Sequence, residues 1–383
     1  MAHLLDYVRW RGDLAFDIEP FNSLDAALFA ALSYLPFDKS VTGHTLGEAS
    51  ERLYYKRIKP YKLGPAENLE LQLMPISARY KNIEFVDWSK KIQKRPAIQF
   101  TAATFRIAPK KILVSFRGTD GSMIGITEDV YMSYQPEITG QTVAANYLQE
   151  IANRFPNSEI ITVGHSKGGN FATYAVASLP PQDQDRVIKA YSFDGPGFMK
   201  ETYDTPNFQS AISKMITYVP EGSIFGMMLD HPERTLVVKS DVNMMKQHDP
   251  RRWNVARDGF VLAPGLTNTS RIIRNSFISW NTEIPRQQRQ AFWLALFSAI
   301  ENQNITEFSQ LKANKLRAAI QFSYTYLNLP PDIRLIANQI ISDIAATART
   351  HVNIPLINKA DTLKPLGNDS SKGPIVLDSY NGA

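Results

Sequence analysis

The stretch that decides the fold is Ile160-Ile161-Thr162-Val163-Gly164-His165-Ser166-Lys167-Gly168-Gly169. An apolar run of strand character leads into a G-x-S-x-G pattern, and small residues typical of a tightly packed helix follow it. Glycines two residues either side of Ser166 permit a sharp strand-to-helix turn that projects the hydroxyl clear of a sheet. Three fixed positions in five residues also recur by chance, but here the flanking strand and helix favour an α/β-hydrolase nucleophile elbow.

Strand and helix patterns alternate on both sides of this turn. Apolar runs of strand length predict strands at 82–88, 98–107, 111–116, 159–163, 187–193, 214–219 and 235–239. Between them we expect helices at 26–35, capped by Asn22-Ser23-Leu24-Asp25, and at 140–155 and 166–179, with a polar, glycine-containing loop after Asp120. The alternation predicts an α/β fold with a mostly parallel central sheet covered by helices on both faces.

The pattern changes after the last predicted strand. Helical periodicity and the break at Pro330-Pro331 predict helices over 287–302, 306–327 and 331–350. We therefore expect a catalytic domain over residues 1–265, a helical C-terminal appendage over 266–350 packed on it, and a loosely ordered tail over 351–383.

Composition excludes several classes of function. The 383 residues are 44% hydrophobic, as in globular proteins, and include no cysteine, which excludes disulfides, thiolate metal sites and a cysteine nucleophile. The net charge of +5 is spread along the chain without a basic helix or a zinc motif, so we expect no nucleic-acid partner, although it is compatible with peripheral contact with an anionic membrane. The charged and polar N-terminus lacks the pattern of a secretory signal, and we expect a cytoplasmic location.

The general base must follow the serine, because this fold orders its triad as serine, acid and histidine. His231, His248 and His351 follow Ser166, and His165 lies inside the elbow, where its side chain should point away from the serine. His351 lies beyond the sheet pattern. His248 is favoured because it follows the last predicted strand by a short loop, whereas His231 is interpreted as a solvated loop residue.

The acid should end a strand between serine and histidine. Asp194 ends the run Lys189-Ala190-Tyr191-Ser192-Phe193 and is followed by Gly195-Pro196-Gly197, a turn that keeps the carboxylate at the edge of the sheet. Glu221, at the end of the next strand, is the main alternative, and Asp241 is more distant. A carboxylate that only caps its own turn is the competing interpretation of Asp194.

The oxyanion hole requires two backbone donors. One is the N–H of Lys167, the residue after the nucleophile, and the other is assigned to Thr119, whose hydroxyl is also available as a donor. A purely structural turn at Arg117-Gly118 is the alternative for the second. The side chain of Lys167 is interpreted as solvated at the start of a helix, because the sequence offers no partner for it. No metal or organic cofactor is required.

The paired motifs Val114-Ser115-Phe116-Arg117-Gly118-Thr119-Asp120 and Val163-Gly164-His165-Ser166-Lys167-Gly168-Gly169 resemble the class 3, fungal-type lipases. As a whole the chain is similar to a bacterial lipase-like family of unknown function, mostly from Gram-positive species, through 192–198, 218–220 and 247–250. The resemblance implies a lipase or esterase with Thr119 as oxyanion donor and Ser166 as nucleophile. In class 3 lipases the aspartate follows the strand that here leads into Val219-Pro220-Glu221-Gly222-Ser223, where none stands, which favours Asp194.

These residues predict a serine hydrolase that cleaves a carboxylic ester, with a small acyl ester or lipid as substrate. Apolar residues at 198–199 and 224–229 line an acyl pocket or belong to the core. Those at 291–297 form a lid, a membrane-facing surface or, as we favour, a contact buried against the main domain. Two alternatives stay open at this point: acyl transfer to an alcohol or amine through the same acyl-enzyme, and a non-catalytic binding or scaffold protein that retains the fold.

Overall fold

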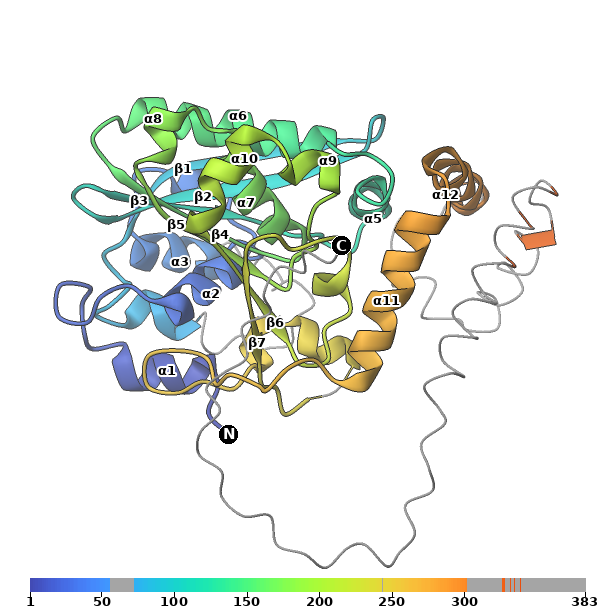
Figure 1. Ribbon diagram of the computed structural model, residues 1–383. Helices are drawn as coiled ribbons and strands as arrows, with labels where there is room; N and C mark the ends of the chain where they lie inside the picture. The colour runs from blue at the N-terminus through green and yellow to red at the C-terminus, as the bar shows by residue number, and fades with distance from the viewer. Residues whose placement is uncertain are drawn as a thin grey trace, which may run out of the picture.

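A single mostly parallel sheet organises the molecule (Figure 1). The structure is a computed structural model and describes residues 1–55, 72–242, 244–301, 326–327, 331, 334 and 338. Seven strands follow one another across the sheet in chain order. They are β1 (Glu84–Gln93), β2 (Ile98–Ala108), β3 (Lys111–Phe116), β4 (Glu159–His165), β5 (Val187–Phe193), β6 (Met215–Pro220) and β7 (Arg234–Val238). β1, β2 and β3 pair antiparallel, and β3 to β7 pair parallel.

Helices cover both faces of this sheet, as the alternating pattern predicts (Figure 1). One face carries α1 (Leu4–Arg11), α2 (Ser23–Leu32) and α3 (Leu46–Tyr55). The other face carries α5 (Met123–Tyr131), α6 (Thr139–Arg154), α7 (Lys167–Ser178), α8 (Pro181–Gln184), α9 (Lys200–Tyr203) and α10 (Pro206–Ala211). Short 3₁₀ turns are η1 (Lys39–Val41), η3 (Met74–Ile76), η4 (Ile212–Lys214), η5 (Phe225–Met227), η6 (Met244–His248) and η7 (Pro250–Arg252).

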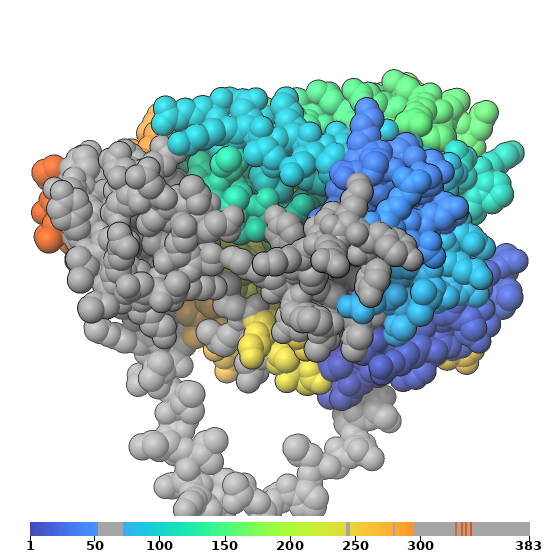
Figure 2. Space-filling view, turned by 180° about the vertical axis from the view of Figure 1, so that it is seen from behind, coloured from blue at the N-terminus to red at the C-terminus, as the bar shows by residue number. Residues whose placement is uncertain are grey.

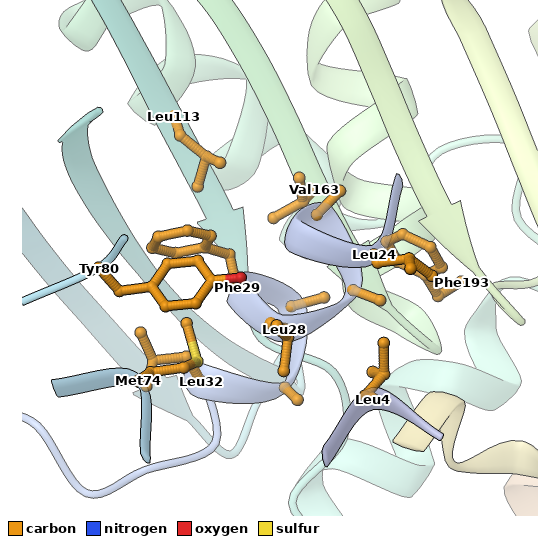
Figure 3. Packing of buried hydrophobic residues seen from close by; sticks show 14 of the residues in the cluster. Leu4, Leu24, Leu28, Phe29, Leu32, Met74, Tyr80, Leu113, Val163 and Phe193 are labelled. Atoms are coloured by element: carbon orange, nitrogen blue, oxygen red, sulfur yellow. The ribbon is translucent and has the colours of Figure 1, made fainter. Parts of the chain in front are cut away.

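Strand alternation divides the apolar residues into two cores. In β3, Leu113 belongs to the cluster under α2, whereas Ile112 and Val114 belong to the cluster under α6 and α7. Figure 3 shows the first cluster, in which Phe29 and its neighbours on α2 lie against Leu113 of β3 and Val163 of β4. Both faces of the parallel strands are therefore buried, which explains their near-continuous apolar sequence.

The start of α2 follows from its capping residues. The Asn22 side chain accepts hydrogen bonds from the N–H groups of Leu24 (2.8 Å) and Asp25 (3.3 Å), and Asp25 in turn accepts one from the Asn22 N–H (3.0 Å). This reciprocal cap confirms the helix start predicted from Asn22-Ser23-Leu24-Asp25.

The expectation of a polar loop after Asp120 is wrong, because α5 lies there. Its glycine suggested a loop, but the Ser122 hydroxyl caps the helix by accepting from the Gly125 N–H at 3.2 Å. Gly125 also allows close packing, since a Cβ there would lie 2.9 Å from both the Gln99 side-chain oxygen and the Thr119 Cγ2. Glu128 on this helix is buried, so tertiary contacts stabilise α5, and the sequence periodicity did not reveal them.

Helices follow the sheet at the C-terminal end of the described chain. These are α11 (Asn268–Glu283) and α12 (Arg286–Glu301), the second close to the predicted 287–302. Apart from five isolated residues, the predicted helices 306–327 and 331–350 and the tail 351–383 lie outside the described residues, and the boundary at 265/266 stays a prediction. No helix within the described ranges is both long and apolar enough to cross a membrane.

A buried polar cluster joins the N-terminal segments to one another. Asp25 on α2 accepts from Arg79 (2.8 and 2.6 Å), from the Tyr80 hydroxyl (2.6 Å) and from the Tyr7 hydroxyl (3.2 Å). The side chains of Asp25 and Arg79 are both 0% exposed. In the space-filling view from behind (Figure 2), blue atoms of the N-terminal part of the chain lie next to cyan atoms of the residues that follow it in the sequence.

We expect Asp25→Asn to lower the free energy of unfolding by about 3 kcal/mol, because it leaves a buried guanidinium without a counter-charge. Urea denaturation measures this change. Asp204→Asn is the matched control, since Asp204 forms an exposed ion pair with Lys200 (2.7 Å) and its loss should cost less than about 0.5 kcal/mol. Equal effects of the two substitutions would contradict this role for Asp25.

Candidate active site

The turn between β4 and α7 holds Ser166 in a rare backbone conformation. Ser166 has φ 57° and ψ −135°, outside the regions that most side chains adopt. The backbones around it are in direct contact: a Cβ at Gly164 would lie 2.0 Å from the Gly168 carbonyl oxygen, and one at Gly168 would lie 2.2 Å from the Phe116 oxygen. Glycine is therefore required at both positions, and this geometry leaves the Ser166 side chain half-buried at the end of the sheet.

Asp194 and His248 lie together. Asp194 follows β5 with φ 50° and is 1% exposed. Its Oδ2 accepts a hydrogen bond from His248 Nδ1 at 2.7 Å, and its Oδ1 accepts one from the Ser223 hydroxyl. The loop after β6 closes over this carboxylate, because a Cβ at Gly226 would lie 2.3 Å from Asp194 Oδ1. The buried carboxylate thus has a partner on each oxygen.

The alternative acids occupy other places. Glu221 lies at the end of β6, where its backbone N–H donates to Val238 (2.9 Å) and its carbonyl accepts from Thr267 (2.7 Å). Asp241 lies at the surface and pairs with His3 (3.1 Å) and the N-terminal amine (3.7 Å). The structure brings neither carboxylate to His248. From the loop after β6 it is Ser223, and not Glu221, that contacts the Asp194 carboxylate.

Two aromatic rings flank the imidazole of His248. The rings of His165 and Phe225 each lie with their centroids 4.5 Å from that of His248, whose side chain is 22% exposed. The preceding residue is also fixed, because the Gln247 carbonyl accepts from the Trp253 indole (2.6 Å) and the Gln247 side chain accepts from the Gly222 N–H (2.9 Å). In the described part of the chain no hydrogen bond joins Ser166 Oγ to this imidazole.

His165, the residue before the serine, holds the backbone of His248. Its Nε2 donates to the His248 carbonyl oxygen at 2.6 Å, and its Nδ1 accepts from the Tyr34 hydroxyl at 3.0 Å. Burial and, to a smaller extent, the neighbouring His248 together lower the pKa of His165 to about 3, so the ring is neutral at ordinary pH. A neutral imidazole has one N–H, and the carbonyl beside Nε2 fixes it there. Sequence reasoning missed this role, because it depends on contacts with Tyr34, which lies just after α2, and with His248 at the end of η6.

The interpretation of the Lys167 side chain as solvated is wrong. Lys167 is 1% exposed, and its ammonium lies 2.6 Å from Glu128 Oε2 and 3.5 Å from Asp129 Oδ1. These partners come from α5, which the sequence did not predict. Burial raises the pKa of the Glu128 carboxyl despite the opposing effect of the Lys167 charge.

Thr119 lies in the loop after β3, as expected, but its hydroxyl is already used. The hydroxyl contacts both carboxylate oxygens of Asp129, at 2.6 and 2.9 Å, so it donates to α5. Only the Thr119 amide then remains as a candidate oxyanion donor. The loop is close to the serine, because a Cβ at Gly118 would lie 3.2 Å from Ser166 Cβ.

The interpretation of His231 as a solvated loop residue is also wrong. Its Nδ1 pairs with Glu233 at 2.8 Å, and its side chain is only 11% exposed. Glu233 also accepts from the Thr217 hydroxyl. His231 therefore belongs to a separate buried pair, and His351 lies outside the described residues.

Of the apolar segments that the sequence suggested for an acyl pocket, 198–199 contributes to the core and 224–229 to the site. Phe198 packs in the core against Phe208, with ring centroids 4.9 Å apart, whereas Phe225 contacts His248. In the C-terminal helices Trp280 packs on Phe292 (5.7 Å) and Trp293 (6.4 Å), and those three side chains are half-buried. These contacts join α11 to α12, and Leu294 is 51% exposed, so burial of this segment against the main domain stays a prediction.

Comparison with known proteins places the chain in a family. Residues 74–298, more than half of the chain, match the sequence model described as Mbeg1-like. The chain belongs to the Mbeg1-like family. The matched range of this Mbeg1-like protein includes all seven strands together with Ser166, Asp194 and His248. No curated protein matches its sequence.

Solved structures similar to this Mbeg1-like chain include fungal lipases. Lipase II from Rhizopus niveus matches with 16% identity and a TM-score of 0.37 over 56% of this chain and 78% of its own. Yarrowia lipolytica LIP2 lipase matches with 14% identity and a TM-score of 0.38 over 64% and 84%. The lipase from Rhizopus microsporus var. chinensis matches with 16% identity and a TM-score of 0.33 over 63% and 87%. The predicted α/β architecture, a mostly parallel central sheet covered by helices on both faces, is confirmed.

The pKa of His165 makes stability depend on pH. Between pH 6.5 and about 3 the unfolded chain binds a proton that folded His165 does not, so acidification lowers the free energy of unfolding. We expect His165→Asn to lose less stability than wild type between about pH 7 and about pH 4.5. Urea denaturation at the two pH values measures the difference, and equal losses would contradict a buried neutral His165.

Proposed function

We propose that this Mbeg1-like chain is a serine hydrolase that cleaves a carboxylic ester through an acyl-enzyme on Ser166. The observation that carries the proposal is the buried Asp194 carboxylate bonded to His248 Nδ1 (2.7 Å) beside a serine held at φ 57°. A carboxylate in that position fixes the imidazole tautomer with hydrogen on Nδ1 and leaves the Nε2 lone pair as a base.

The first half of the proposed reaction forms the acyl-enzyme. Ser166 Oγ attacks the acyl carbon and His248 Nε2 takes its proton, while Asp194 stabilises the resulting imidazolium. The contact between Ser166 and His248 forms with the bound substrate, as catalytic hydrogen bonds often do. Collapse of the tetrahedral intermediate breaks the bond to the leaving alkoxide, and His248 protonates that oxygen to release the alcohol.

The second half returns the free enzyme. Water attacks the acyl carbon, its proton passes to His248, and the bond to Ser166 Oγ breaks as that oxygen regains a proton. The products are one alcohol and one carboxylic acid. In both halves the negative oxygen is stabilised by the N–H groups of Lys167 and Thr119, and Lys167 lies at the first turn of α7, where the helix dipole is positive.

An apolar acyl group is the substrate feature that the site supports. Phe225 and Ile224 are half-buried at the edge of the site, and Phe225 lies against the His248 ring. An acyl chain that contacts these residues loses apolar surface to water, which contributes about 25 cal/mol per Å². We therefore propose an ester with an apolar acyl chain, of lipid or smaller size.

Fluorophosphonate labelling of the purified protein tests the activated serine. We expect wild type to be labelled and Ser166→Ala to remain unlabelled, because removal of the nucleophile removes the attacking oxygen. p-Nitrophenyl esters of graded chain length then give the preferred acyl group. Absence of both labelling and ester hydrolysis in wild type would refute the proposed function.

The position of the acid makes a second test. We expect Asp194→Asn to lower kcat by about 10⁴-fold, since it no longer favours the reactive tautomer. Ser223 touches the same carboxylate, so the double variant Asp194→Asn with Ser223→Asp should recover part of that loss. Ser223→Asp alone is the control for damage by the new charge. Activity of Asp194→Asn within a few-fold of wild type would remove Asp194 from the mechanism.

A further inference from the structure

A buried charge cluster of Lys167, Glu128 and Asp129 begins at the residue that follows the proposed nucleophile. The Lys167 side chain is 1% exposed and the Glu128 side chain 0%, and their charged atoms are 2.6 Å apart. The proposed mechanism uses only the backbone N–H of Lys167, so its ammonium has no part in it. Removing two charges from water costs several kcal/mol per ion before their attraction is counted. An apolar side chain would fill the same space without this desolvation free energy, so we ask what the buried charge contributes.

The cluster connects the two proposed oxyanion donors to each other. Asp129 Oδ1 lies 3.5 Å from the Lys167 ammonium, and the Asp129 carboxylate accepts the Thr119 hydroxyl at 2.6 Å. A continuous path of polar contacts therefore runs from the residue after the serine to the loop after β3. Both ends of this path are residues whose backbone N–H groups must point at one developing negative charge.

The α5 carboxylates are themselves held from several sides. Glu128 Oε2 also accepts the Gln99 N–H of β2 at 3.0 Å. The start of α6 closes over the same carboxylate, because a Cβ at Gly140 would lie 2.1 Å from Glu128 Oε1. On the other side of Lys167 the Phe171 ring lies 5.8 Å from the ammonium. Movement of the Thr119 loop relative to the elbow would break these buried contacts.

We infer that Lys167 is a positioning residue. Its ammonium, through Asp129 and Glu128, holds the backbone N–H groups of Thr119 and Lys167 at the spacing that an oxyanion requires. The inference rests on the proposed function and adds to it. Donors fixed before the reaction stabilise a developing charge without reorganisation, and loss of one such donor lowers kcat by about 10²–10³-fold. Displacement of a donor should have a smaller effect of the same kind.

The test is the near-isosteric pair Lys167→Met with Glu128→Gln, which removes both fully buried charges. The carboxylate that remains, Asp129, is 33% exposed and keeps its hydrogen bond from the Thr119 hydroxyl. The measurement is the second-order rate of fluorophosphonate labelling, because the phosphonyl oxygen occupies the same donors as an oxyanion. We expect labelling to slow by about tenfold or more, while urea denaturation shows a folded protein. The matched control is Lys111→Met with Glu159→Gln, a lysine–glutamate pair (3.4 Å) at the opposite end of β3 and β4, which should label like wild type.

Thr119→Val distinguishes positioning from a merely structural role. If Lys167 acts through Asp129 and Thr119, adding Thr119→Val to the paired variant should slow labelling little further. If the slowing caused by Thr119→Val instead multiplies the slowing caused by the paired variant, Lys167 does not act through Thr119. If the paired variant does not fold, Asp129→Asn tests the same path and leaves the buried Lys167–Glu128 pair in place, because the Asp129 side chain is 33% exposed. This variant too should slow labelling.

The outcomes separate the two proposals. Labelling of the paired variant at the wild-type rate, with wild type labelled and Ser166→Ala not, would overturn the role of Lys167 and leave the hydrolase proposal intact. Failure of wild type to label would refute the proposed function itself. Slower labelling confined to the variants of this cluster supports the inference.

Discussion

The rest of the structure depends on the backbone packing of Gly164 against Gly168 and of Gly168 against Phe116. This contact brings the ends of β3 and β4 and the start of α7 within atomic contact, because a Cβ at Gly164 or Gly168 would lie 2.0 or 2.2 Å from a carbonyl oxygen. It forces Ser166 to the positive φ that sets its hydroxyl apart from the sheet. The parallel strands, apolar on both faces, supply the rigidity that a strained turn of this kind requires.

The acid and base are positioned by their surroundings as much as by the strands. Asp194 is buried and satisfied on both oxygens, by His248 and by Ser223, so a change at the loop after β6 acts directly on the carboxylate. His248 is held by its backbone carbonyl through His165 and by its ring against Phe225. These partners lie at the ends of β4 and β6, whereas Asp194 follows β5, so three neighbouring strand ends together position the acid and the base.

The sheet, the elbow and the capped start of α2 could be predicted from sequence, because glycine spacing, apolar runs and capping side chains are local signals. Asp194 and His248 could be proposed from their places after strands. The partners of Lys167 could not be predicted, because they lie on α5, whose glycine and polar residues resemble a loop until Glu128 is seen to be buried. The pairing of His231 with Glu233 and the role of His165 likewise depend on tertiary contacts that no local pattern records.

A crystal structure of the fluorophosphonate adduct would show whether Ser166, His248, Asp194 and the two N–H donors surround one phosphorus atom. We expect the phosphorus on Ser166 Oγ and the phosphonyl oxygen within about 3 Å of the Lys167 and Thr119 N–H groups. We also expect His248 Nδ1 to keep its contact with Asp194. A phosphonyl oxygen directed away from those amides, or a His248 separated from Asp194, would contradict the proposed mechanism.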